Sequence, residues 1–161
     1  MPRMQRQRYN SVKFTRAVDK KCALRYNYCE TFRSWKGDAI MFVSSREMLL
    51  EAQRGGYAVG AFNFENMEML QAIVGAAEEM RAPIMLQTTP STVKYASVEL
   101  FAAMAREVAG RASVPVALHL DHGNSFELAR AAAGAGYTSL MIDGSQLDFE
   151  ANVALSRSVV D

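Results

Sequence analysis

Apolar runs and stretches of helical period alternate from residue 41 to the end of the chain, and no such alternation precedes residue 41. Continuous apolar runs with the length of strands begin near four positions: Ala58, Ile84, Val114 and Leu140. Elsewhere apolar residues recur every three to four positions, which predicts helices over 65–80, 99–109, 126–133 and 149–160. The pattern therefore predicts successive strand and helix units.

Capping and turn residues mark where some of these helices begin and end. Ser44 and Glu47 form a capping-box pattern, which predicts one more helix that begins there and ends at Gly55 and Gly56. A loop rich in Thr, Pro and Ser is predicted between the second strand and the helix over 99–109. Within that helix the apolar residues spaced by four are Leu100, Met104 and Val108.

Strands that are apolar throughout, rather than at every second position, indicate burial on both faces, as in a parallel sheet covered by helices. The strands restart about every 25 to 30 residues, a spacing typical of βα units. The fold class is therefore α/β, either a doubly wound open sheet or a (β/α)8 barrel. No G-x-G-x-x-G fingerprint follows the first strand, where residues 60–65 read GAFNFE, and this disfavours a dinucleotide-binding sheet.

Polar side chains follow each predicted strand at its carboxyl end. In chain order they are Asn63; Gln87, Thr88 and Thr89; Asp121 and His122; and Asp143 and Ser145. In both α/β architectures this edge of the sheet is where ligands bind. Turn or helix-capping roles remain open for Asn63, Thr88 and Ser145 taken singly. Polar residues at four successive strand ends nevertheless predict a ligand site at that edge.

Both histidines of the chain lie in the motif His119-Leu120-Asp121-His122-Gly123. On a regular strand positions 119 and 121 share one face and position 122 points to the other, so the two histidines are not expected to chelate one ion together. If the strand ends near Asp121, Gly123 allows a turn after which Asp121 and His122 face one pocket. A carboxylate beside a histidine is typical of a catalytic pair or a supported metal ligand, whereas His119 is better explained as a buried histidine bound to the backbone.

Four segments together resemble one enzyme family. They are YAVGAFN at 57–63, APIMLQ at 82–87, LHLDHG at 118–123 and SLMIDGS at 139–145. In sequence and order they resemble the class II fructose- and tagatose-bisphosphate aldolases, and the resemblance extends over 41–161. It implies a (β/α)8 barrel of the TIM type, of which this chain carries the first four βα units, a half barrel. It also implies a zinc-dependent lyase that reversibly cleaves a ketose 1,6-bisphosphate to dihydroxyacetone phosphate and glyceraldehyde 3-phosphate.

The resemblance implies roles for individual residues. Asp121 is expected to exchange a proton with the C4 oxygen of the sugar as the bond between C3 and C4 breaks or forms. His122 is expected to bind Zn²⁺, which polarises the ketone and stabilises the enediolate as a Lewis acid. Asp143 and Ser145 are expected to support a second metal position or to contact the metal ligands. The residues expected near bound substrate are Asn63, Gln87 and Thr89.

The expected partners are a phosphorylated ketose and, for the full-length enzyme, further copies of the chain in a dimer or tetramer. Residues 89–94, TPSTVK, resemble the T-P-x-T loop of tagatose-bisphosphate enzymes more than the glycine-rich loop of many fructose enzymes, which favours tagatose 1,6-bisphosphate. The family's second half is expected to add two zinc histidines, a proton-transferring glutamate and phosphate-binding loops. Because zinc catalytic sites need about three protein ligands, this polypeptide alone is expected to bind zinc poorly and to be inactive.

Composition is that of a globular protein, because 50% of the residues are hydrophobic and 22% are charged. No apolar run approaches the roughly 18 residues of a membrane span, so a membrane role is not expected and a cytoplasmic location is. The net charge of +1 is unevenly distributed, since residues 1–40 carry ten Lys and Arg against three Asp and Glu, a net charge of +7. Cys22 and Cys29 lie in this segment at a spacing that fits neither a redox motif nor a zinc ribbon.

Residues 1–40 show no sustained period and are interpreted as a basic extension, non-native or disordered, before a domain at 41–161. Interleaved basic and aromatic residues leave a nucleic-acid-binding arm open, and an Arg-rich, acid-poor leader leaves an organelle transit peptide open, although nucleic acid is not the expected partner. A Schiff-base aldolase is disfavoured because Lys94, in a predicted loop, is the only lysine after residue 40. A noncatalytic aldolase-like subunit or fragment remains an alternative.

Overall fold

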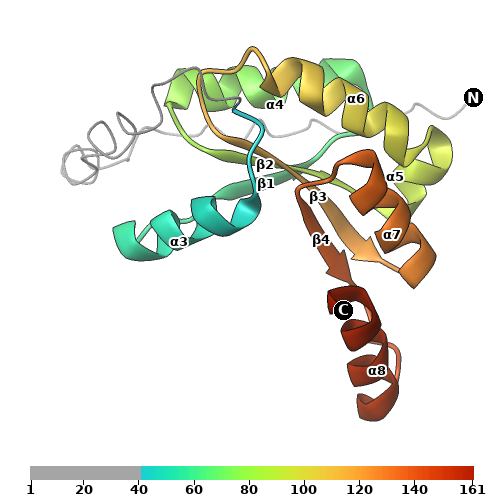
Figure 1. Ribbon diagram of the computed structural model, residues 1–161. Helices are drawn as coiled ribbons and strands as arrows, with labels where there is room; N and C mark the ends of the chain where they lie inside the picture. Colours follow the sequence, from blue (N-terminus) through green and yellow to red (C-terminus); the bar gives the residue numbers. More distant parts are fainter. Residues whose placement is uncertain (1–40) are drawn as a thin grey trace, which may run out of the picture. The chain divides into compact units, whose positions relative to one another are not determined.

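The computed structural model describes residues 41–161, which are part of one compact unit (Figure 1). The predictions for residues 1–40, as a basic extension, a transit peptide or a nucleic-acid-binding arm, lie outside the described residues and stay predictions. Within the described part of the chain, no helix has both the length and the apolar character needed to cross a membrane.

Parallel strands form one sheet in the order β1-β2-β3-β4. They are β1 (Gly60–Asn63), β2 (Ile84–Thr88), β3 (Val116–Gly123) and β4 (Ser139–Ile142). Each strand pairs in parallel with the next strand of the chain, and helices connect them. A doubly wound sheet reverses its strand order partway, whereas a barrel adds strands in one direction. The sequential order confirms the predicted α/β class, with the βα units arranged as a half barrel.

Each helix of the described residues begins at a polar capping residue. The helices are α3 (Ser45–Gly55), α4 (Met67–Met80), α5 (Pro90–Tyr95), α6 (Val98–Ala109), α7 (Phe126–Ala135) and α8 (Phe149–Val160). Their caps, whose side-chain oxygens accept a backbone N–H of the first turn, are Ser44, Asn66, Thr89, Ser97, Ser125 and Asp148. Such a cap contributes about 1 kcal/mol because it pairs a donor that the helix leaves free. The predicted α3 boundaries are confirmed, and Gly56 ends the helix with a left-handed backbone (φ 67°).

The segment predicted as a Thr, Pro and Ser loop is a helix, α5. Thr89 caps it, with its hydroxyl 3.4 Å from the backbone nitrogen of Thr92. Pro90 occupies the first position, where its fixed φ suits a helix and its missing N–H costs nothing. The prediction that Lys94 lies in a loop is therefore wrong, because Lys94 lies in the last turn of this helix.

The buried face of α6 is not the line of apolar residues spaced by four. Leu100 is 50% exposed, whereas Phe101 is fully buried. The buried residues of this helix are Val98, Phe101, Ala102, Ala105 and Ala109. Phe101 packs edge-on against Phe64, which directly follows β1, with the ring centroids 5.3 Å apart. Small alanines beside one large ring, rather than the line that begins at Leu100, define the side that packs into the core.

Different helices cover the two faces of the sheet (Figure 1). One face contacts α4, α6 and α7, and its fully buried leucines are Leu86, Leu118 and Leu120. On the opposite face Met85 and Ala117 pack against Met48 of α3. Because side chains alternate between faces along a strand, Gln87 and His119 follow Met85 and Ala117 on this second face. The face that α3 covers near the strand starts therefore becomes polar toward the strand ends.

Candidate functional site

A β-bulge at the carboxyl end of β3 brings Asp121 and His122 together. β3 pairs regularly with β4 up to Leu120, and pairing resumes at Gly123 after three steps along β3 but only two along β4. The extra residue belongs to β3, and His122 adopts a left-handed backbone within the bulge (φ 54°). Its Nε2 lies 3.9 Å from a carboxylate oxygen of Asp121. β3 extends to Gly123 instead of ending near Asp121, where its end was predicted. A bulge, rather than a turn, reorients the two side chains.

Gly123 allows β3 and β4 to approach closely at this bulge. A Cβ at this position would lie 2.8 Å from the carbonyl oxygen of Met141 and 2.9 Å from Cδ2 of Leu120. The backbone N–H of Asp143 donates to the Gly123 carbonyl over 2.7 Å. A larger residue would therefore force the two strands apart where they carry the candidate site.

His122 is held by a carboxylate from the next strand end. Its Nδ1 lies 2.7 Å from Oδ2 of Asp143, whose Oδ1 accepts the backbone N–H of Ser145 over 2.9 Å. Hydrogen bonds from the Ser145 side chain, from His122 and from the Ser145 backbone hold the pKa of Asp143 well below its usual range. An ionised carboxylate only accepts hydrogen bonds, so Nδ1 of His122 carries a proton, and in the neutral ring Nε2 keeps a free lone pair.

The same contacts raise the pKa of the His122 imidazole. The hydrogen bond to Asp143 is the larger cause, and the charge of Asp121 acts in the same direction. The side chain is 58% exposed, so Nε2 is accessible. A metal ion competes with a proton for this nitrogen, and metal binding is therefore expected to weaken as the pH falls through the raised pKa. A histidine oriented by a carboxylate on its other nitrogen is the usual arrangement of a metal-binding imidazole.

His119 lies in a different environment from His122. It is half-buried, and its Nδ1 is 2.7 Å from Oγ of Ser139. Burial lowers the pKa of His119, and the charge of Asp121 opposes this effect only in part. The imidazole is therefore neutral near pH 7. The prediction that His119 bonds to the backbone is wrong, because its hydrogen-bond partner is the side chain of Ser139.

His119 belongs to a row of polar residues across one face of the sheet. The register pairs Asn63 with Gln87, Gln87 with His119, and His119 with Ser139. Paired residues of neighbouring strands project to the same face. This polar row (Asn63, Gln87, His119 and Ser139) includes two of the residues predicted near substrate. Ser139 was not predicted, because only the pairing of β3 with β4 reveals that it faces His119.

Thr89 takes part in a cluster of hydroxyl groups at the start of α5. Its Oγ1 lies 2.8 Å from Oγ of Ser91 and 3.0 Å from Oγ1 of Thr92. The Thr92 hydroxyl donates to Glu65 over 3.1 Å. These contacts tie α5 to the segment after β1 and use Thr89 as a cap. Its role near substrate stays a prediction, and Glu65 was not predicted because its partner lies far away in the sequence.

No group of three His, Cys, Asp or Glu side chains within residues 41–161 is arranged to hold a metal ion. Asp143 accepts from the His122 ring, and Ser145 donates to Asp143, so both contact the candidate ligand from behind. The described residues thus offer one oriented histidine nitrogen as a metal ligand. Their donor set fits part of a zinc site and not a whole one.

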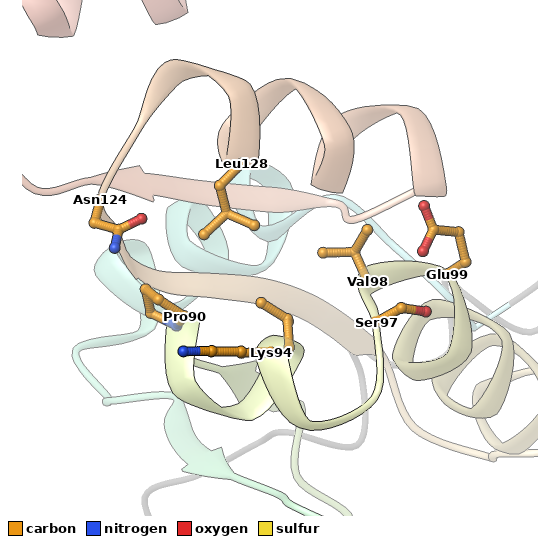
Figure 2. A pocket seen from close by; sticks show the side chains of 8 residues that line it. Pro90, Lys94, Ser97, Val98, Glu99, Asn124 and Leu128 are labelled. Atoms are coloured by element: carbon orange, nitrogen blue, oxygen red, sulfur yellow. The ribbon is translucent and has the colours of Figure 1, made fainter.

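A shallow cavity of about 340 Å³ lies outside the strand-end site (Figure 2). Its lining residues are Pro90, Val93, Lys94, Ser97, Val98, Glu99, Asn124 and Leu128. Figure 2 shows Lys94 and Asn124 at one end of it and Glu99 at the other. None of the predicted site residues lines this cavity. The candidate site is therefore defined by its hydrogen bonds and by the strand register, and not by this cavity.

The opposite pKa shifts of the two histidines predict separate titrations. By NMR of the full chain, the ring protons of His119 are expected to titrate below the ordinary value of about 6.5, and those of His122 above it. Asp143→Asn removes the main cause of the upward shift and is expected to move the His122 midpoint down, leaving His119 unchanged. Asp148→Asn, in the cap of α8, is the matched control. An unchanged His122 midpoint in Asp143→Asn would contradict the assigned pair.

Sequence comparisons identify close relatives. Residues 43–161 match the family model described as class-II fructose-bisphosphate aldolase. The chain is 46% identical over 121 residues to the fructose-bisphosphate aldolase of Helicobacter pylori, covering 74% of this chain and 39% of the relative. It is 46% identical over 122 residues to the D-tagatose-1,6-bisphosphate aldolase subunit GatY of Klebsiella oxytoca (76% and 43% covered). The fructose-bisphosphate aldolase of Geobacillus stearothermophilus is 47% identical over 124 residues (74% and 42% covered).

Solved structures agree with the sequence relatives. The YdjI aldolase from Escherichia coli K12 superposes with a TM-score of 0.70 at 38% identity, over 74% of this chain and 46% of that one. The fructose-bisphosphate aldolase of Campylobacter jejuni superposes with a TM-score of 0.61 over 70% and 41% of the two chains, and at 20% identity it supports the fold alone. The chain spans about two fifths of the length of the curated relatives that it matches.

Proposed function

We propose that this chain, which belongs to the class II fructose-bisphosphate aldolase family, contributes Asp121 and His122 to the active site of a ketose-bisphosphate aldolase. The reaction is the reversible cleavage of a ketose 1,6-bisphosphate to dihydroxyacetone phosphate and glyceraldehyde 3-phosphate. One observation carries the proposal. The β3 bulge aligns Asp121 beside His122, and Asp143 leaves the Nε2 of His122 free.

His122 is the residue of this chain that would bind Zn²⁺. Its Nδ1–H donates to Asp143, which fixes the ring and makes Nε2 a better ligand. Ser145 donates to the same carboxylate and keeps it ionised. We therefore assign Asp143 and Ser145 to the support of His122. When bound, the ion supplies Lewis-acid polarisation of the substrate carbonyl.

Asp121 is the proposed acid and base. Its side chain is 20% exposed and lies 3.9 Å from the imidazole of His122, close enough to act on a substrate held beside that ring. As the bond between C3 and C4 breaks, the carboxylate accepts the proton of the C4 hydroxyl, and in the reverse direction it returns this proton to the C4 oxygen. A half-buried carboxylate at a strand end suits this transfer, because the strand fixes its position.

The remaining predicted residues are proposed to contact the substrate. Asn63 and Gln87 belong to the polar row and offer amide groups to sugar oxygens. Thr89 caps the start of α5, two residues after Gln87. The chain resembles fructose and tagatose enzymes at similar identity, and the Thr89-Pro90 start of α5 favours tagatose 1,6-bisphosphate as the substrate. A homodimer or homotetramer is the proposed assembly of the enzyme.

A chimera tests this function. The full chain is joined to the part of the Geobacillus stearothermophilus enzyme that lies beyond the matched segment, and cleavage of tagatose and fructose 1,6-bisphosphates is measured. We expect cleavage that is lost with EDTA and restored by zinc, because the added segment supplies further ligands. The polypeptide without the added segment is expected to bind zinc weakly and to show no cleavage.

Two results would contradict the proposal. Cleavage that survives EDTA and allows borohydride trapping at Lys94 would indicate a Schiff-base enzyme. A folded, zinc-loaded chimera that cleaves neither sugar would indicate a noncatalytic aldolase-like subunit. The ratio of kcat/KM for the two sugars decides the substrate.

A further inference from the structure

We propose that His119 donates a hydrogen bond from Nε2 to an oxygen of the bound sugar, and that the Ser139 hydroxyl locks the imidazole in this tautomer. The inference rests on the proposed function and adds a substrate contact to it. Two geometric facts carry it. Nδ1 of His119 lies 2.7 Å from Oγ of Ser139, and His119 lies between Gln87 and Ser139 in the polar row.

The position of His119 along its strand places it at the bottom of the candidate site. Two residues earlier on the same face, Ala117 is fully buried and packs with Met48 and Met85. Two residues later comes Asp121, the proposed acid and base. His119 therefore lies, with the rest of the polar row, at the level where the apolar layer ends and the polar strand ends begin.

The chemistry of the neighbours favours one tautomer. A neutral imidazole carries a proton on one nitrogen only, and the serine hydroxyl is able to donate or to accept. The Asp121 carboxylate acts electrostatically on His119 and accepts hydrogen bonds only. A nearby negative charge stabilises an N–H directed into the site, which places the proton on Nε2. The Ser139 hydroxyl then donates to Nδ1.

The composition of the polar row indicates which part of a substrate it binds. Its members are two amides, an imidazole and a hydroxyl, without a lysine or an arginine. Such groups match hydroxyl and carbonyl oxygens, whereas a phosphate needs cationic side chains or several backbone N–H groups. The proposed ligand of His119 is therefore an oxygen of the sugar chain and not a phosphate oxygen.

The tautomer is measured first, on the full chain by ¹⁵N NMR of its two histidines. We expect His119 to appear at pH 7 as a neutral ring protonated at Nε2. Ser139→Ala is expected to lower the fraction of rings protonated at Nε2, because only the Asp121 charge then favours this tautomer, and Ser139→Thr, which keeps the hydroxyl on a residue suited to a strand, is expected to restore it. A ring protonated at Nδ1 overturns the proposal.

The substrate contact is measured in the chimera with a matched pair of variants. The amide nitrogen of glutamine reaches about as far as Nε2, whereas that of asparagine stops near Nδ1. Loss of one hydrogen bond to the sugar costs a factor of about 5 to 150 in affinity, so His119→Asn is expected to raise KM by about that factor. His119→Gln is expected to retain most of the affinity. The zinc content is expected to be equal in both variants.

The possible outcomes separate this proposal from the proposed function. Equal KM values for the Gln and Asn variants, or a loss of zinc in either, overturn the sugar contact. A chimera with native His119 that shows no zinc-dependent cleavage overturns the proposed function and the sugar contact together. The tautomer measured on the full chain is independent of cleavage and decides the Ser139 lock in every case.

Discussion

Replacing Asp121 with asparagine in the chimera is expected to lower kcat by roughly 10²- to 10⁴-fold, the usual contribution of a general acid and base. Asparagine keeps the size of the side chain but neither takes up nor releases a proton at neutral pH. KM is expected to change little, because the substituted group still fits beside the bound sugar. The zinc content is expected to stay constant, since the proposed ligand is Nε2 of His122, 3.9 Å from this carboxylate. A coupled assay for triose phosphate release measures the effect.

Asp148→Asn provides the control for this substitution. It makes the same chemical change at the cap of α8, where the side chain accepts the backbone N–H of Ala151 over 2.8 Å. Asparagine caps helices as well as aspartate, so full activity is expected. A kcat for Asp121→Asn within about tenfold of the unmodified chimera would remove Asp121 from proton transfer. Loss of zinc from this variant would instead assign the carboxylate to the metal site.

Replacing Phe101 with alanine is expected to lower the free energy of unfolding by about 3–5 kcal/mol. The ring is fully buried on α6 and packs edge-on against Phe64 at a centroid distance of 5.3 Å. Its removal leaves a cavity between α6 and the sheet, and it deprives Phe64 of its aromatic partner. Urea unfolding of the full chain, followed by circular dichroism, measures the change.

Leu100→Ala is the matched control, because it removes a large apolar side chain from the neighbouring position of the same helix. Leu100 is 50% exposed, so its loss is expected to cost less than about 1 kcal/mol. The two variants thus distinguish the buried face of α6 from the line of residues spaced by four. Equal destabilisation by both substitutions would show that the assigned face is wrong.

Features that depend on neighbouring residues could be predicted from the sequence. Apolar runs marked the four strands, but only the central strands β2 and β3 are mostly buried, whereas the edge strands β1 and β4 contain no buried residue. Ser44 marked the start of α3, because a cap acts on a backbone group within the first turn. The same locality placed Asp121, His122 and Asp143 at strand ends, where the apolar runs stop.

The side chains that meet at this edge could not be predicted in the same way. Alternation along β3 assigned Asp121 and His122 to opposite faces, and one extra residue in the pairing with β4 changes this outcome. A bulge arises from the pairing of two strands. No local pattern in either strand shows how many residues the partner strand has between two paired positions. The contact of His122 with Asp143 and that of His119 with Ser139 depend on this register.

The sequence by itself determined the class of fold, the order of its elements and the residues that stand at the carboxyl edge of the sheet. Local hydrogen bonds and runs of burial control these properties, and both are visible along the chain. Only the tertiary structure decided that Asp143 orients His122, that Ser139 faces His119 and that Phe101 rather than Leu100 enters the core. The physical reason is that strand register and helix rotation are set by packing between segments distant in sequence, where a shift of one residue changes every partner.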